Sequence, residues 1–311
     1  MNGTADALVV FGITGDLART KTLPALYDLA EQGVLTMPVI GVGRRPLRGD
    51  ELQEHARAAI LAAKKDGLDS RVLESFLSRL SYVGGDAMDD DLYTHLRTAL
   101  VGAKLPVFYL AVPPATFLES SENLAQARLL DDARLVVEKP FGTDLVSARE
   151  LNRRLTALVP EDRLYRIDHF LGKEPVQDIM YLRFSNALFE PVWSREHVDS
   201  IQVTMAEDFG VEGRGAFYDR VGALRDVVQN HLLQVLALVA MEPPAGDDDA
   251  VSRHRLDVFR SMPSVDPAHA VRGQYQGYEK VEGVQKGSDT ETFVGLKLMI
   301  ENWRWLRLRR R

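Results

Sequence analysis

The sequence of 311 residues contains no cysteine. This absence excludes disulfide bonds, catalysis by a thiolate and metal sites ligated by cysteine. The sequence also lacks an apolar run of the roughly 20 residues that a membrane-spanning helix needs. Its first residues, "MNGTADALVVFG", do not show the basic stretch and long apolar segment of a signal peptide. We therefore expect an intracellular protein, located in the cytoplasm.

An excess of basic charge is absent too. The chain has 38 lysines and arginines against 45 aspartates and glutamates, and its net charge is -7. This balance predicts no nucleic-acid partner, and we expect neither a membrane partner nor a metal site. The length is sufficient for two domains, and the hydrophobic fraction of 45% is ordinary for a globular protein.

A glycine-containing turn follows the first apolar run. Residues 7–11 form a short apolar run that is typical of a buried parallel strand. Gly12, Gly15 and Ala18 come next, and a helical pattern continues to Leu29. A strand, a glycine turn and a helix in this order can present backbone N–H groups to a pyrophosphate. The alternative is a tight turn that binds no ligand.

Two arginines end the second predicted strand. In "MPVIGVGRRPL", residues 37–47, Arg44 and Arg45 stand where an NAD enzyme has an acid that binds the ribose. A guanidinium group suits a 2'-phosphate, so the sequence favours NADP. The alternative is a pair of solvated surface arginines.

Strand-like and helix-like segments alternate through the first half of the chain. This alternation predicts a doubly wound parallel sheet with helices on both faces. The further predicted strands span residues 80–84, 106–112 and 133–140, and the helices span 49–64, 90–101 and 117–129. Pro113 and Lys139 follow two of these strands, at the sheet edge where such folds bind ligands.

After Leu164 the alternation ends. The sequence predicts a long strand at residues 198–210, a long helix at 217–241 and a half-exposed strand at 290–305. We expect an α+β second domain with a large, incomplete and mostly antiparallel sheet. The predicted domains are residues 1–167 and 168–311.

Six segments resemble, in order, those of the glucose-6-phosphate dehydrogenase family. They are "GITGDLARTK", "EKPFG", "RIDHFLGKE", "EGRGAFYDRVGALRDVVQNHLLQ", "RGQY" and "NWRW", and the resemblance runs from about residue 7 to Trp305. It implies a Rossmann-like NADP-binding domain and a substrate-binding domain. The implied reaction is the oxidation of glucose 6-phosphate to 6-phosphogluconolactone by NADP, in the oxidative pentose phosphate pathway.

The resemblance also implies the roles of individual residues. His231 corresponds to the catalytic base, and Asp168 to the carboxylate that orients it. A positioned base contributes roughly 100- to 10,000-fold, and a neighbouring carboxylate holds the histidine in the required tautomer. The implied cofactor-binding residues are Gly12, Thr14, Gly15, Asp16, Leu17, Arg44 and Lys139. The implied substrate-binding residues are Lys139, His169, Lys173, Glu207 and Asp226.

Two features leave alternatives open at the implied substrate site. Asp226 and His231 are five residues apart, which is not one face of an ideal α-helix. They can line one pocket only from opposite flanks or near a helix start. Phe170 stands where the family usually has tyrosine, so one hydroxyl contact to the phosphate is missing.

The last residues depart from the family pattern. The family continues well past "NWRW" with a segment that completes the large sheet and carries much of the interface of its homo-oligomers, whereas this sequence reads "LRLRRR". From an open strand edge we expect lower stability, self-association and weak substrate affinity. Two hypotheses follow: an active NADP-dependent dehydrogenase, or a catalytically impaired relative that still binds NADP.

Overall fold

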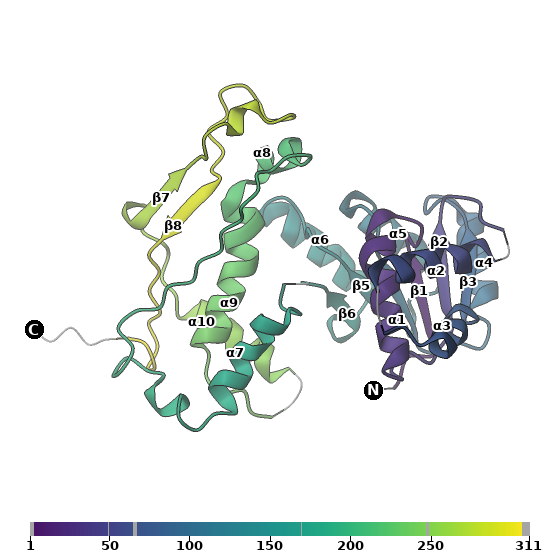
Figure 1. The fold of residues 1–311 in the computed structure, drawn as a ribbon, viewed down its shortest axis with the longest axis horizontal. Coiled ribbons are helices and arrows are strands. Elements are labelled where there is room, and N and C mark those ends of the chain that lie inside the picture. The colour runs from purple at the N-terminus through teal and green to yellow at the C-terminus, as the bar shows by residue number, and fades with distance from the viewer. Residues whose placement is uncertain (1–2, 49, 65–66, 169, 247–248, 307–311) are drawn as a thin grey trace, which may run out of the picture. The chain divides into compact units, whose positions relative to one another are not determined.

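The computed structural model describes residues 3–48, 50–64, 67–168, 170–246 and 249–306. The chain divides into two compact units, residues 1–168 and 169–311. Figure 1 shows the fold with its helices and strands labelled along the chain.

The first unit is built on a parallel sheet of six strands (Figure 1). The strands are β1 (Ala7–Phe11), β2 (Val39–Gly43), β3 (Leu80–Gly84), β4 (Pro106–Leu110), β5 (Arg134–Val137) and β6 (Leu164–Arg166). Their order is β3-β2-β1-β4-β5-β6. Strands β2 and β3 therefore lie on one side of β1, and β4, β5 and β6 lie on the other, so the strand order reverses between β1 and β4. In such sheets, ligands bind outside the carboxyl ends of the strands at this reversal.

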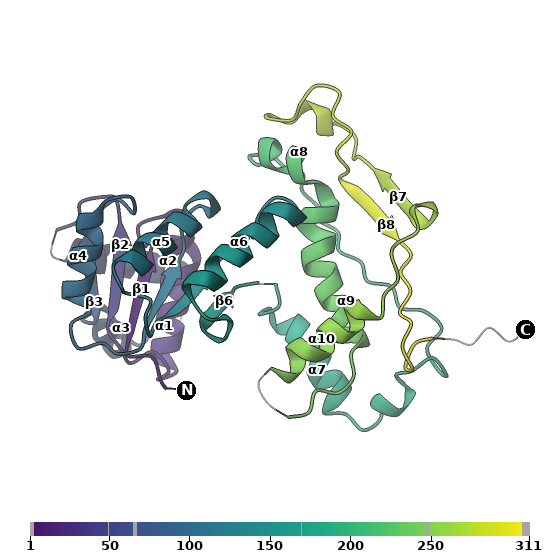
Figure 2. The same ribbon diagram turned by 180° about the vertical axis from the view of Figure 1, so that it is seen from behind.

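Helices cover both faces of this sheet (Figure 2). Side chains of α1, α2 and α3 pack with one face in one apolar cluster, and side chains of α4, α5 and α6 pack with the other. The helices are η1 (Ala18–Thr22), α1 (Leu23–Glu31), α2 (Glu51–Ala63), α3 (Ser70–Leu77), α4 (Asp90–Ala99), η2 (Pro114–Thr116), α5 (Phe117–Gln126), α6 (Leu145–Leu158) and η3 (Glu161–Arg163). The predicted doubly wound sheet is therefore confirmed.

Among the strands and α-helices of the first unit, β6, α3 and α6 were not predicted. A local signal for α6 is present in the sequence, because Asp144 and Ser147 form a capping box. The Ser147 amide donates to Asp144 Oδ1 at 2.8 Å, and the Asp144 amide donates to Ser147 Oγ at 3.0 Å. This pair fixes the start of α6 directly after the segment that contains Lys139.

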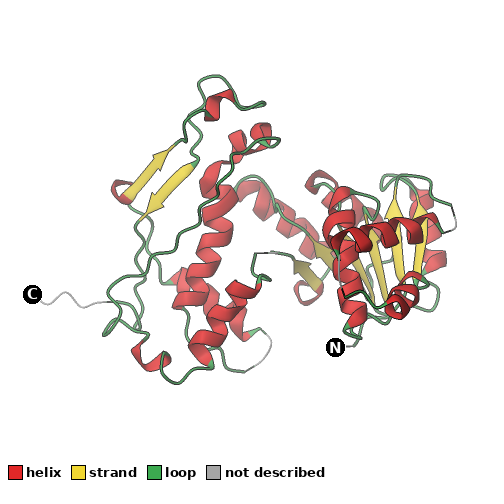
Figure 3. Cartoon of the chain, in the orientation of Figure 1, coloured by secondary structure: helices red, strands yellow, loops and turns green. Residues whose placement is uncertain are grey.

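The second unit is mainly helical (Figure 3). Its elements are α7 (Glu174–Phe184), η4 (Glu190–Val192), α8 (Gly215–Ala223), η5 (Leu224–Leu232), α9 (Leu233–Ala240), α10 (Ala250–Arg260), η6 (Pro267–His269), β7 (Ala270–Gly273), η7 (Tyr278–Lys280) and β8 (Phe293–Leu296). Val176 of α7, Leu238 of α9 and Val258 of α10 share one apolar cluster, so α7 and α10 pack against α9. The predicted long helix is interrupted at Gly222, where the backbone leaves the helical conformation.

The predicted large sheet is not formed within the described residues. In the second unit they pair only β7 with β8, antiparallel, over four residues each. The strand predicted at 198–210 is absent there, and of the strand predicted at 290–305 only β8 is formed. An alternating pattern favours an extended chain, but the chain becomes a strand only where a neighbour accepts and donates its backbone hydrogen bonds. The α+β class is confirmed, with a small antiparallel sheet.

Candidate active site

The turn after β1 lies at the carboxyl edge of the sheet and contains two glycines, Gly12 and Gly15. Gly12 has a φ of +78°, and a Cβ on it would lie 2.3 Å from the carbonyl oxygen of Ala111. The Gly15 amide donates to the Gly12 carbonyl at 2.9 Å. Asp16 and Leu17 are exposed beside this turn. Only glycine fits at position 12, and the open turn leaves room for a phosphate group to approach the backbone.

A π-helix, η1, follows the turn directly. Its first residue, Ala18, is fully buried, so the helix packs closely on the sheet as the sequence pattern requires. Thr14 lies beside the end of the neighbouring strand β2. A Cβ atom placed on Gly43, the last residue of that strand, would be 2.9 Å from Thr14 Oγ1. Gly12, Thr14 and Gly15 thus gather at one edge of the sheet, next to the chain that leaves β2.

Arg44 and Arg45 lie at that same edge and are exposed. The hydroxyl of Tyr82, on β3, lies 2.7 Å from the carbonyl oxygen of Gly43 and 2.5 Å from that of Arg45. Burial raises the pKa of Tyr82, so this hydroxyl keeps its proton and can donate to either carbonyl. Tyr82 therefore fixes the backbone on both sides of Arg44. The sequence analysis did not single it out, although it sits in the strand predicted at 80–84.

Lys139 follows β5 at the carboxyl edge and is half-buried. The residue before it, Glu138, accepts a hydrogen bond of 2.7 Å from the hydroxyl of Tyr109 on β4. Burial, together with the Glu138 carboxylate, raises the pKa of Tyr109. Because β4 and β5 are neighbours in the sheet, this bond holds the backbone beside Lys139 to the strand that borders the reversal point.

In the second unit, two distant sequence motifs meet at an aromatic contact. The ring centroids of Phe170 and His231 are 4.4 Å apart. The Lys173 ammonium lies 4.7 Å from the centroid of the Phe170 ring. His231 is 8% exposed. The segment that begins α7 therefore places an aromatic ring next to the buried imidazole and a cation over that same ring.

The helix that carries His231 has an unusual geometry at this point. Leu224–Leu232 is a π-helix, η5, in which each amide bonds to the carbonyl five residues earlier. In an α-helix, Asp226 and His231 would be separated by about 140° around the axis. The wider turn of η5 brings residues five apart closer to one face. Asp226 also lies in the first turn of η5, which agrees with the alternative of a helix start.

Asp226 has a basic partner that the sequence analysis did not single out. The Arg214 guanidinium donates to Asp226 Oδ2 at 3.1 Å. Tyr218 is buried beside them, and burial, followed by the charges of Asp226 and Glu291, raises its pKa to about 12. Arg214 belongs to the segment "EGRG", and nothing in that segment of the sequence indicates an ion pair with Asp226.

Three predicted site residues remain: Asp168, Glu207 and His169. Asp168 is the last residue of the first unit, whereas His231 belongs to the second. Glu207 is exposed in an extended segment that forms no strand. His169 lies outside the described residues.

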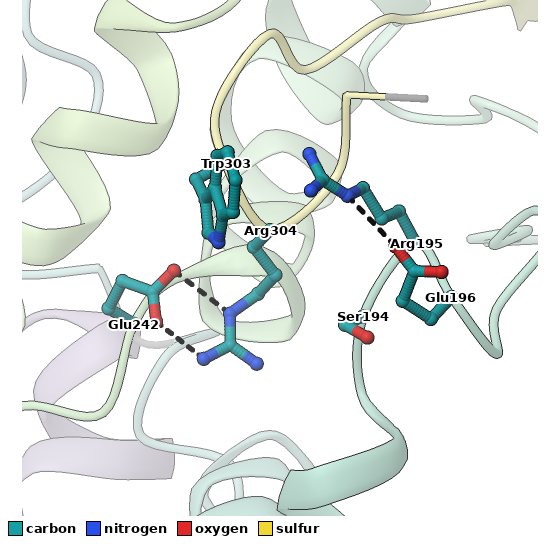
Figure 4. Close-up of a pocket in the computed structure, with 6 residues that line it drawn as sticks. All are labelled: Ser194, Arg195, Glu196, Glu242, Trp303 and Arg304. Carbon is teal, nitrogen blue, oxygen red and sulfur yellow. Dashed lines mark hydrogen bonds and ion pairs between the residues drawn. The ribbon is translucent and has the colours of Figure 1, made fainter. Parts of the chain in front are cut away.

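The second unit also contains a pocket of about 360 Å³ that holds none of the predicted site residues (Figure 4). It is lined by Ser194, Arg195, Glu196, Glu242, Trp303 and Arg304. Arg304 donates to Glu242 Oε1 at 3.0 Å and to Glu190 at 2.6 Å. Its two arginines are matched by carboxylates, so the pocket is an ion-paired surface rather than a site for an anion.

Among the described residues, no group of three or more histidines, aspartates or glutamates is arranged to hold a metal ion. None of the helices in these ranges is long and apolar enough to cross a membrane.

Comparison with known protein families accounts for both units of the chain. Residues 9–178 match the family model "Glucose-6-phosphate dehydrogenase, NAD binding domain", and residues 180–308 match the model of the C-terminal domain of the same enzyme. The chain belongs to the glucose-6-phosphate dehydrogenase family. The resemblance found in the sequence is thereby confirmed, and the first unit contains the nicotinamide-cofactor domain of this family.

Individual relatives in the glucose-6-phosphate dehydrogenase family agree with this assignment. The chain is 52% identical over 304 residues to glucose-6-phosphate 1-dehydrogenase 1 of Mycobacterium tuberculosis (strain ATCC 25618 / H37Rv), covering 97% of this chain and 65% of that protein. It is 44% identical to glucose-6-phosphate 1-dehydrogenase of Rhizobium meliloti (strain 1021), over 96% of this chain and 65% of that protein. The chain thus spans 65% of the length of these relatives.

Solved structures of this family have the same fold. The crystal structure of glucose-6-phosphate 1-dehydrogenase from Mycobacterium avium matches with a TM-score of 0.86 and 53% identity, covering 97% of this chain and 67% of that one. A glucose-6-phosphate dehydrogenase in complex with glucose 6-phosphate matches with a TM-score of 0.90 and 36% identity, covering 98% and 68%.

Proposed function

We propose that this chain is an NADP-dependent glucose-6-phosphate dehydrogenase that oxidises glucose 6-phosphate to 6-phosphogluconolactone. The observation that carries the proposal is the contact of Phe170 with His231, with Lys173 beside the same ring. Through the shared Phe170 ring, a cation suited to a phosphate and a buried histidine suited to take a proton belong to one cluster. An enzyme that oxidises the anomeric carbon of a sugar phosphate needs both groups in one site: a cation to bind the phosphate and a base to take the hydroxyl proton.

In the proposed reaction, His231 acts on the hydroxyl of the anomeric carbon. The imidazole accepts the hydroxyl proton while the C1–H bond breaks and the C1–O bond becomes a carbonyl. The bound nicotinamide supplies the acceptor for the hydride. Asp168 is the carboxylate that we assign to orient the imidazole and to stabilise its charged form. His231 then returns its proton to solvent.

The substrate residues divide between the two ends of the sugar. Lys173 binds the phosphate as a point charge, and the resemblance assigns His169 to the same group. Asp226 and Glu207 accept hydrogen bonds from sugar hydroxyls. Because Asp226 and His231 share the π-helix η5, the sugar ring would be held and deprotonated from one rigid element.

The cofactor residues fit a dinucleotide with a 2'-phosphate. The pyrophosphate would lie on the turn of Gly12 and Gly15, where the backbone is open. Arg44, exposed at the end of β2 with no acid beside it, would bind the 2'-phosphate. Lys139 would contact both substrate and nicotinamide. Residues 1–167 then form the NADP-binding domain and residues 168–311 the substrate-binding domain.

The experiment is to follow the absorbance of NADPH after the purified chain is mixed with NADP and glucose 6-phosphate. We expect NADPH to form with glucose 6-phosphate, much more slowly with glucose, and more slowly when NAD replaces NADP. NADP binding without turnover would instead favour the second hypothesis, a catalytically impaired relative. Absence of both binding and turnover would refute the proposal.

A further inference from the structure

The π-helix that carries Asp226 and His231 begins at a break in the backbone. Gly222 has a φ of +71° and a ψ of 171°, and this conformation breaks the helix two residues before η5 begins. The carboxylate of Glu291 occupies the space beside it. A Cβ on Gly222 would lie 2.5 Å from Glu291 Oε1, so only glycine leaves room for this carboxylate.

Glu291 binds the first amides of the new helix. The Leu224 amide donates to Glu291 Oε1 at 3.0 Å. The Ala223 amide donates to the backbone carbonyl of Glu291, also at 3.0 Å. The first amides of a helix have no partner within the helix, and a carboxylate is also favoured there by the helix dipole. Glu291 therefore caps η5 with its side chain and its backbone.

The segment that contains Glu291 is itself fastened to the preceding helix. Asp219, on α8, accepts hydrogen bonds from Ser288 Oγ at 2.5 Å and from the Gln285 amide at 3.1 Å. The Thr290 hydroxyl donates to the Asp219 carbonyl at 2.6 Å. The bonds of Ser288 and Gln285 to the Asp219 carboxylate hold this segment on α8, and the Thr290 bond adds to its stability. The cap itself is formed by Glu291.

We infer that Glu291 is a positioning residue for the reaction: it sets where η5 begins and so where Asp226 and His231 stand. The inference rests on the proposed function. Both residues follow Leu224 on one continuous helix, so a shift of the capped end moves them together. A displacement of about 1 Å in a catalytic group can cost about 100-fold in rate.

Three variants separate positioning from plain stabilisation. Glu291→Ala removes the acceptor, Glu291→Gln keeps an oxygen for the Leu224 amide, and Thr290→Val removes a bond of the same segment but leaves the cap. We expect Glu291→Ala to lower kcat/KM for glucose 6-phosphate by about 10-fold or more, with NADP affinity within about twofold. Glu291→Gln should restore most of the activity. Thr290→Val should lower the melting temperature but leave kcat unchanged.

A second measurement does not depend on turnover. Amide hydrogen exchange over residues 224–231 should be about 10-fold faster in Glu291→Ala and unchanged in Thr290→Val, because only Glu291→Ala loses the side-chain acceptor of the Leu224 amide. If the unsubstituted chain does not reduce NADP, the proposed function fails, and the exchange still tests the cap. Exchange over 224–231 in Glu291→Ala at the unsubstituted rate would overturn the inference. So would normal kinetics in Glu291→Ala, or kinetic losses in Thr290→Val that equal those of Glu291→Ala.

Discussion

The ring of Phe170 lies 4.4 Å from the imidazole of His231, measured between centroids. These residues are far apart in the sequence, and each belongs to a different motif of the family. Their contact joins the start of α7 to the π-helix η5, and it places an aromatic ring of one motif against the buried histidine of the other.

His231→Asn tests the assignment of the base. Asparagine cannot take the hydroxyl proton, so we expect turnover to fall by about 100-fold or more while KM for glucose 6-phosphate changes little. The measurement is steady-state kinetics. The control is His95→Asn, because His95 is exposed on α4 of the other unit. A His231→Asn variant with normal turnover would refute the role of this residue.

Lys173→Ala tests the phosphate site. The ammonium beside Phe170 is proposed to bind the phosphate, so its loss should raise KM for glucose 6-phosphate far more than KM for free glucose. Comparing the two substrates in one variant separates phosphate binding from structural damage. If both constants rise alike, Lys173 does not recognise the phosphate.

Phe170→Tyr tests the missing hydroxyl. Tyrosine in this position would offer a hydrogen bond to the phosphate, and a charge-assisted bond contributes about 1.5–3 kcal/mol. We therefore expect KM for glucose 6-phosphate to fall by about 10-fold, with KM for glucose unchanged. An unchanged or higher KM for glucose 6-phosphate would show that the ring at position 170 does not face the phosphate.

Much of the first unit could be predicted from the sequence, because strands such as β1 and β2 are short runs of mostly buried residues. The predicted strands at 7–11 and 80–84 coincide with β1 and β3. The missed strand β6 is only three residues long, which is too short to show a period. In the second unit, alternation alone overpredicted strands, because pairing depends on neighbours that a single segment does not reveal.

The proposed site residues were predicted from motifs rather than from geometry. Spacing predicted a glycine turn, and Gly12 adopts the positive φ that it requires. The spacing of Asp226 and His231 was ambiguous, because an α-helix was assumed and a π-helix is present. Arg214 and Glu291 were missed, since they act through contacts between segments that are distant in the sequence.

Arg44→Ala tests the preference for NADP. Removing the guanidinium should weaken NADP binding by about 1.5–3 kcal/mol and leave NAD binding nearly unchanged. Isothermal titration with each cofactor measures both. Arg71→Ala, which removes an exposed arginine from α3, is the matched control. Equal losses for NADP and NAD would exclude a contact with the 2'-phosphate.

The ionisation of Glu242 should make the stability of the chain depend on pH. Its hydrogen bonds from Arg304 hold the pKa of Glu242 below its ordinary value. A lowered pKa in the folded state contributes stability above the unfolded value of about 4.3, and this contribution is lost as the pH falls through the folded pKa. We expect Glu242→Gln to lower the melting temperature at pH 7. The melting temperature of this variant should also decrease less than that of the unsubstituted chain as the pH is lowered. Glu196→Gln should change neither the melting temperature at pH 7 nor its decrease in acid. Parallel melting curves for Glu242→Gln and the unsubstituted chain across this range would contradict the account.

In the proposed reaction the chain moves a hydride from the anomeric carbon of glucose 6-phosphate to NADP. The most direct measurement uses glucose 6-phosphate deuterated at C1, with mass spectrometry of the reduced cofactor after incubation with the purified chain. We predict that the NADPH carries the deuterium and forms more slowly than with unlabelled substrate. Failure to form NADPH, or NADPH without deuterium, would contradict the claim.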